Sequence, residues 1–141
     1  MYRTKLNIVE LEQGDFHTLV NGRVAGKAVR MVLDTGASRS CMDMAYVAEM
    51  LPKLQTSVHE GVTAGIGGDD FEVRTADISD FRIGHFQMDC YRDMALLDFS
   101  YINLAYQRLR RKPVQVILGN DFLVQHKAVI DYANKILLFE K

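Results

Sequence analysis

The chain has 141 residues, 48% of them apolar and 25% charged, which are ordinary values for a globular domain. We expect a single domain spanning residues 1–141, because this length allows one hydrophobic core but is short for two. A net charge of −1 and a pI near 6.4 argue against a nucleic acid or an anionic membrane as partner. The one basic run, Arg108 to Lys112, ends a helical pattern, where cations suit the helix dipole, so we interpret it as solvated.

Cysteines and histidines are too sparse to build a metal site or a disulfide framework. The two cysteines are Cys41 and Cys90, and the four histidines show neither i,i+4 pairing nor a cysteine at ligand spacing. We therefore expect no metal and no cofactor. Residues 1–16 contain no apolar stretch long enough for a signal peptide, and no later segment is long enough to span a bilayer. These features favour a cytoplasmic protein with no membrane partner.

In chain order, short strand-like patterns dominate and helical patterns interrupt them. The expected strands alternate apolar and polar residues or form short apolar runs between turn residues, and they are 16–24, 27–33, 58–64, 71–78, 81–83, 86–91, 114–118, 128–132 and 136–139. The expected helices are 42–51, 98–111 and 120–126. The second is the clearest, because Ile102, Ala105, Tyr106 and Leu109 recur at helical spacing and Pro113 follows it.

The residues Asp34-Thr35-Gly36-Ala37-Ser38 follow the apolar run Val29 to Leu33. A carboxylate at the end of a buried strand is costly unless it is hydrogen-bonded or functional. Gly36 lets the backbone turn sharply, and we expect the hydroxyls of Thr35 and Ser38 to hold the carboxylate. Asp, Thr and Gly are also common in turns, so this motif alone would fit an ordinary Asx-type turn.

Further features of the sequence favour a functional motif. Ile117-Leu118-Gly119 ends a second apolar strand and precedes a short helix, and the glycine-rich run 64–68 lies between two strand-like stretches. In this order, the Asp-Thr-Gly motif, the glycine-rich run and the apolar-apolar-Gly motif resemble the retropepsin-like aspartic protease family. The Asp-Thr-Gly-Ala-Ser form and the run 119–123 look closer to bacterial members and to the domain of the DNA-damage-inducible shuttle proteins than to the viral enzymes.

The resemblance implies a mainly β fold, a closed acid-protease β-barrel, here with two inserted helices and a short helix in the C-terminal region. It also implies an aspartic endopeptidase that acts on a peptide or protein substrate with a water molecule activated by two carboxylates. The chain has only one Asp-Thr-Gly motif, because Asp43, Asp77, Asp80 and Asp131 lack the following Thr/Ser-Gly. The resemblance therefore implies a homodimer in which each subunit contributes Asp34.

The resemblance also assigns roles to individual residues. The catalytic residues would be Asp34, with Thr35 bracing the pair and Gly36 offering its carbonyl to the substrate backbone. A glycine-rich flap with an apolar tip would close over the substrate. The substrate-binding residues would be Ala37, Ser38, Cys41, Gly65, Ile66, Gly67 and Ile117.

Some of these positions have alternative interpretations. Ser38 and Asn120 stand where the viral enzymes carry an aspartate and an arginine that pair, so viral substrate preferences do not transfer. Cys41 and Ile117 would also suit plain core packing. The alternative function is a dimeric peptide-binding or scaffold module with the same fold and little proteolysis. The intact Asp-Thr-Gly motif and the glycine-rich run favour the enzyme.

Overall fold

The computed structural model describes residues 1–59 and 73–141, and strands make up most of the described chain. Its elements are β1 (Tyr2–Lys5), β2 (Asn7–Glu12), β3 (Asp15–Val24), β4 (Lys27–Leu33), β5 (Cys41–Asp43), α1 (Met44–Met50), β6 (Ser57–His59), β7 (Val73–Ile83), β8 (Phe86–Leu97), α2 (Ser100–Arg108), β9 (Val116–Leu118), α3 (Asn120–Gln125), β10 (Val129–Asp131) and β11 (Ile136–Phe139).

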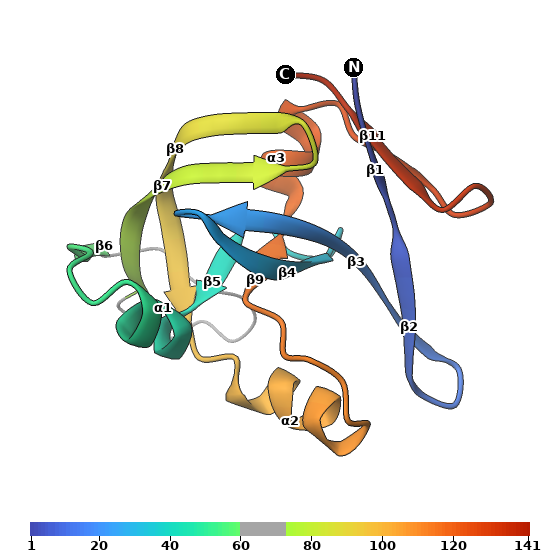
Figure 1. Cartoon of the computed structure of the whole chain (residues 1–141), viewed down its shortest axis with the longest axis horizontal. Helices are drawn as coiled ribbons and strands as arrows, with labels where there is room; N and C mark the ends of the chain where they lie inside the picture. The colour runs from blue at the N-terminus through green and yellow to red at the C-terminus, as the bar shows by residue number, and fades with distance from the viewer. Residues whose placement is uncertain (60–72) are drawn as a thin grey trace.

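The strands form two sheets, and the larger one closes on itself (Figure 1). Its order is β2-β3-β4-β9-β5-β8-β7-β6, and β3 also pairs with β7, so the pairings run in a ring from β3 through β4, β9, β5, β8 and β7 back to β3. The smaller sheet has the order β1-β11-β10 and brings the two termini together. Mainly β structure is therefore confirmed.

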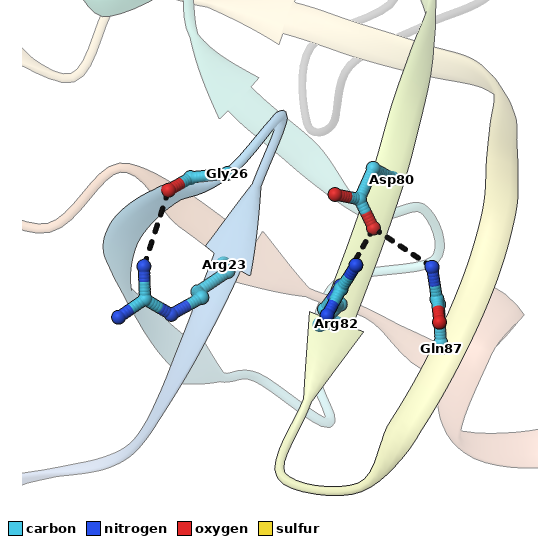
Figure 2. Close-up of polar contacts among 5 residues, drawn as sticks. All are labelled: Arg23, Gly26, Asp80, Arg82 and Gln87. Carbon is cyan, nitrogen blue, oxygen red and sulfur yellow. Dashed lines mark hydrogen bonds and ion pairs between the residues drawn. The ribbon is translucent and has the colours of Figure 1, made fainter.

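The seam of the ring lies where β3 meets β7 (Figure 2). Arg23 and Arg82 are directly opposite in the antiparallel register, a position in which like charges repel. Each guanidinium turns to an acceptor on its own side of the seam. Arg23 donates to the Gly26 carbonyl at 3.1 Å, and Arg82 donates to the Asp80 carboxylate at 2.7 Å. The seam is thus stabilised by satisfying each cation locally, and the Arg82 hydrogen bond lowers the pKa of Asp80.

The core lies inside the ring and extends toward the smaller sheet. Buried residues of β7 come in alternating pairs, which are Val73 and Thr75, Ala76 and Ile78, and Phe81 and Ile83. The alternation is not strict along the whole strand, because the pairing with β8 shifts register between Ala76 and Ile78. An aromatic cluster fills the space between β7, β8, α3 and β11, with ring centroids 4.3–6.5 Å apart, and consists of Phe81, Phe86, Tyr91, Phe122, His126 and Phe139. α3 is therefore packed rigidly behind the end of β9.

α2 projects from the ring as an appended element between β8 and β9 (Figure 1). Tyr106 is fully buried and attaches the helix, because its hydroxyl bonds the His17 ring at 2.8 Å and the Arg30 guanidinium lies 5.6 Å from its ring centre. Leu109, which the periodicity placed on the same face, lies beyond the end of the helix and is 41% exposed.

Several boundaries differ from the sequence-based expectation for identifiable reasons. The expected helix 42–51 was wrong at its start, because Cys41, Met42 and Asp43 pair with β8 and β9 as β5 before the Asp43 side chain caps α1. The expected strand 114–118 begins only at Val116. The backbone groups of Val114 are bonded instead by the Asn103 side chain, at 2.8 and 3.0 Å.

The sequence missed two strands at the N-terminal end but predicted two hairpin turns. β1 and β2 were not expected, whereas the hairpin turns at 25–26 and 84–85 are confirmed. The inner ends of the two expected strands 58–64 and 71–78 lie outside the described residues.

Among residues 1–59 and 73–141, no helix is long and apolar enough to cross a membrane.

Candidate active site

Asp34 lies at the end of β4, next to the end of β9. β4 and β9 are parallel, with Leu33 opposite Leu118, and the Asp34 N–H donates to the Leu118 carbonyl at 2.9 Å. Met31, Val32 and Leu33 are all buried, as expected for a parallel strand covered on both faces. The carboxyl ends of two parallel strands meet at one edge of a sheet. The two motifs that the sequence singled out therefore lie side by side.

The Asp34 carboxylate is exposed and accepts a backbone hydrogen bond. The Gly36 N–H donates to Asp34 Oδ1 at 2.9 Å, and the Ala37 N–H donates to the Asp34 carbonyl at 3.1 Å. This is an Asx-type turn built on a strand end. The expectation that Thr35 and Ser38 hydroxyls hold this carboxylate was wrong for the described part of the chain, because the Gly36 amide takes that role. The rest of the carboxylate faces solvent.

The turn after β9 holds the backbone of the Asp34 loop. Asn120 donates twice, from its N–H to the Ala37 carbonyl and from Nδ2 to the Thr35 carbonyl, both at 2.8 Å. A Cβ on Gly119 would stand 2.7–2.8 Å from backbone atoms of Ala37 and Arg39. Space, rather than an unusual φ, therefore requires glycine here. Asn120 thus bonds the loop backbone directly.

A polar network lies behind the loop and was not predicted from the sequence. Asp121 Oδ1 accepts from Ser40 N–H at 2.8 Å, from Ser40 Oγ at 2.7 Å and from its neighbour Phe122 N–H at 2.9 Å. Ser40 Oγ in turn accepts from the Gly119 N–H at 2.9 Å, and Tyr91 OH contacts Asp121 Oδ2 at 3.2 Å. Burial raises the pKa of Tyr91; a hydrogen bond with Ser40 opposes this rise, and the Asp121 carboxylate adds to it.

Cys41 and Ile117 lie opposite each other where β5 pairs with β9. Cys41 is 5% exposed within a cluster of buried apolar residues, and Ile117 is half-buried beside it. Burial, followed by the Asp121 and Asp34 carboxylates, raises the pKa of the Cys41 thiol to about 12. The environment of Cys41 therefore fits the packing alternative better than a thiol facing a pocket. Ile117 remains compatible with both interpretations.

The other predicted site residues are distributed unevenly. Thr35 and Ser38 are exposed on the loop, and Ala37 is half-buried on it. The predicted flap residues Gly65, Ile66 and Gly67 lie outside the described residues. Within the described ranges, no group of three or more His, Cys, Asp or Glu side chains is placed to hold a metal ion.

Residues 20–122 match a family model described as aspartyl protease. No functionally curated protein matches this sequence. The match begins within β3 and ends within α3, and it includes both strand ends described above.

Solved structures share the fold at low sequence identity. A retropepsin-like aspartic protease from Rickettsia conorii has a TM-score of 0.52 and 17% identity, over 98% of this chain and 88% of that one. The retroviral protease-like domain of Ddi1 from Leishmania major has a TM-score of 0.51 and 15% identity, over 87% and 93%. EIAV protease, solved with the inhibitor HBY-793, has a TM-score of 0.50 and 20% identity, over 76% and 85%. These similarities establish a retropepsin-like fold.

Proposed function

The chain belongs to the aspartyl protease family, and from that premise we propose that it is an aspartic endopeptidase, active as a homodimer that pairs Asp34 from two copies. The observation that carries the proposal is the state of the Asp34 carboxylate. It ends a buried parallel strand, yet it is exposed and bonded by a single backbone N–H of the described chain. A carboxylate held in place but left open to solvent is suited to bind and activate water.

A second carboxylate is needed, because the chemistry divides acid and base roles between two groups. Within the described chain, Asp121 lies nearby in the first turn of α3, but its oxygens are occupied by Ser40, Phe122 and Tyr91. It therefore has no room for a catalytic water. A second copy related by a two-fold axis supplies an identical, unoccupied Asp34. This favours a shared site over one completed inside a single chain.

In the proposed reaction, the two Asp34 carboxylates share one proton, since like charges this close cannot both ionise. The ionised group takes a proton from water as the water oxygen attacks the peptide carbonyl carbon. The neutral group gives its proton to the carbonyl oxygen, which forms a tetrahedral intermediate. The carboxyl group that took the water proton then donates it to the peptide nitrogen, and the C–N bond breaks. A hydroxyl proton of the intermediate returns to the pair, which leaves a carboxylic acid, an amine and a pair that again shares one proton.

The neighbouring residues take supporting roles in this proposal. Thr35 braces the pair across the dimer axis, and Gly36 accepts a hydrogen bond from the substrate backbone. Ala37, Ser38 and Ile117 contact substrate side chains, and Gly65, Ile66 and Gly67 close over them. For Cys41, burial favours a role in core packing over contact with the substrate, and alkylation of the thiol tests which of the two it has.

The test is cleavage of a mixed peptide library by the wild-type protein and by Asp34→Asn. The amide fits the same space and cannot share the proton, so we expect kcat/KM to fall by at least about 10³-fold with fold and dimerisation unchanged. Asp131→Asn is the matched control, because Asp131 also accepts from a turn N–H but belongs to the β10–β11 hairpin. A wild-type dimer that cleaves no peptide between pH 3 and 8 would favour the scaffold alternative instead.

A further inference from the structure

A single carboxylate ties the Asp34 loop to two other parts of the fold. Through Ser40, Asp121 holds the C-terminal end of that loop, and through Phe122 it holds the first turn of α3. Through Tyr91 it reaches β8, whose strand pairs with β7 and β5. Ser40 is 1% exposed, so this junction is largely shielded from water, where unsatisfied polar groups are costly.

The hydrogen-bond directions in this junction can be assigned by counting protons. The N–H groups of Ser40 and Phe122 can only donate. Ser40 Oγ accepts from Gly119 N–H at 2.9 Å, so its one proton points to Asp121 Oδ1 at 2.7 Å. Oδ1 therefore receives three donors and carries no proton of its own. Only Oδ2, facing the Tyr91 hydroxyl at 3.2 Å, has a partner that can either donate or accept.

We propose that Asp121 is a positioning residue for catalysis, acting with Ser40 and Tyr91 to fix where the Asp34 carboxylate stands; this inference rests on the proposed function. The path is short and runs from the Asp121 side chain through the Ser40 side chain to the backbone. Asp121 holds Ser40, and Ser40 Oγ holds the Gly119 N–H. The residue before Gly119 is Leu118, whose carbonyl accepts the Asp34 N–H at 2.9 Å. Moving any of these groups moves the carboxylate itself.

Position matters here because two carboxylates must share one proton. A displacement of about 1 Å in a reacting group costs up to about 10²-fold in rate. It also weakens the coupling between the two carboxylates. Because this coupling is what holds their two apparent pKa values apart, those values move closer together. Loss of the network should therefore lower kcat more than it raises KM, and it should bring the two limbs of the pH–rate profile closer together.

The sharpest test compares the alanine and asparagine variants of Asp121. Asparagine keeps an Oδ1 acceptor for the three donors. Its Nδ2–H can donate to the Tyr91 oxygen, which keeps that contact with the direction of the hydrogen bond reversed. We expect Asp121→Ala to lower kcat about 10–100-fold, with KM changed less than about 3-fold and a narrower pH–rate bell. Asp121→Asn should restore kcat to within about 3-fold of wild type. Wild-type kcat and bell width in Asp121→Ala, or equal damage in both variants, would overturn the proposal.

Two less disruptive substitutions test the same proposal if Asp121→Ala does not fold. Ser40→Ala removes only the hydroxyl that links Asp121 to Gly119, and we expect the same changes at about 3–10-fold in kcat. Tyr91→Phe removes the contact to Oδ2 alone, and its matched control is Tyr46→Phe on α1. An unchanged kcat and pH profile in Ser40→Ala would also contradict the positioning role.

A readout that needs no substrate separates this inference from the proposed function. Amide hydrogen exchange in Ser40→Ala should accelerate by more than about 10-fold at Gly119 and at the loop amides of Asp34 and Ala37, while the amides of β11 stay protected. Exchange unchanged at Gly119 refutes the network. Faster exchange in a protein whose wild type cleaves nothing leaves the network standing and refutes the peptidase.

Discussion

The ends of β4 and β9 lie side by side, and each is followed within three residues by a carboxylate, Asp34 after β4 and Asp121 in the first turn of α3 after β9. The two carboxylates are in opposite states. Asp34 is exposed and accepts one N–H from its own turn. Asp121, three residues beyond β9, contacts four donor groups from the Asp34 loop, α3 and β8. One carboxylate is left open for a reaction, and the other is fully used in fixing the structure around it.

This contrast shows how a small fold separates chemistry from support. The free carboxylate costs little stability to keep exposed, because water solvates it. The saturated one is hard to change, because removing it leaves several donors without partners in a buried setting. In the proposed mechanism, the residues that follow β9 therefore position the site, and Asp34 at the end of β4 takes part in the reaction.

The largest effect should come from removing each carboxylate in turn and measuring stability. Asp121→Ala leaves Ser40 N–H, Ser40 Oγ and Phe122 N–H without their acceptor, and we expect a loss of about 3 kcal/mol in the free energy of unfolding. Asp34→Ala removes one turn hydrogen bond at an exposed site and should cost less than about 1 kcal/mol. Urea unfolding of both variants measures this. Equal losses of unfolding free energy in the two variants would contradict the idea that Asp121 supports the structure while Asp34 does not.

A somewhat smaller effect should come from adding a methyl group where the two strand ends touch. Gly119→Ala places Cβ within 2.7–2.8 Å of the loop backbone, and overpacking of this kind costs about 2 kcal/mol. Gly14→Ala is the control, since no atom lies within 4 Å of its Cβ and only its φ of +85° opposes the change. We expect Gly14→Ala to cost about 1 kcal/mol and to leave peptidase activity unchanged. Thermal unfolding and a cleavage assay of both variants give the comparison.

The smallest effect concerns the reactivity of the Cys41 thiol, which lies on β5 opposite Ile117 of β9. Because burial, Asp121 and Asp34 keep its thiol neutral, iodoacetamide at pH 8 should modify Cys90 in the folded protein and spare Cys41. Mass spectrometry after proteolysis distinguishes the two sites. If Cys41 reacts as fast as Cys90, and Cys41→Ala protects activity from the reagent, the thiol faces the substrate pocket after all.

The same raised pKa gives a pH dependence of stability with a definite sign. The unfolded chain releases the Cys41 proton near the usual value of 9.0, whereas the folded chain keeps it up to about 12. The stabilisation is therefore complete below pH 9 and is lost as the pH rises toward 12, by up to about 1.4 kcal/mol per pH unit. Urea unfolding from pH 8 to 11 should show a shallower decline in Cys41→Ala than in Cys90→Ala.

The sequence was sufficient for the parts of this site whose signal is local. An apolar run followed by Asp34 and Gly36, and another followed by Gly119, are patterns of a strand ending in a turn. Both strands form and end where expected, although the second begins only at Val116. Turn chemistry likewise predicted the hairpin at Ala25-Gly26. These features depend on neighbours in the chain, so their spacing carries the information.

The parts that were missed depend on distant partners. Asp121 looks like any acidic residue in the first turn of a helix, and nothing near it in sequence indicates Ser40 or Tyr91. β5 was hidden inside a helical pattern, because three residues are too few to show a strand period. Thr35 and Ser38 carry hydroxyls suited to bond Asp34, but in the described chain the Gly36 amide makes that bond.

The central claim is that Asp34 works as a pair contributed by two copies of the chain. Mixing wild-type protein with folded Asp34→Asn, at fixed wild-type concentration and well above the dimer dissociation constant, tests it most directly. Mixed dimers then hold one carboxylate and one amide, so peptidase activity per wild-type chain should fall in proportion to the wild-type fraction. Activity per wild-type chain that stays constant as Asp34→Asn is added would contradict the account, because each chain would then contain a complete site.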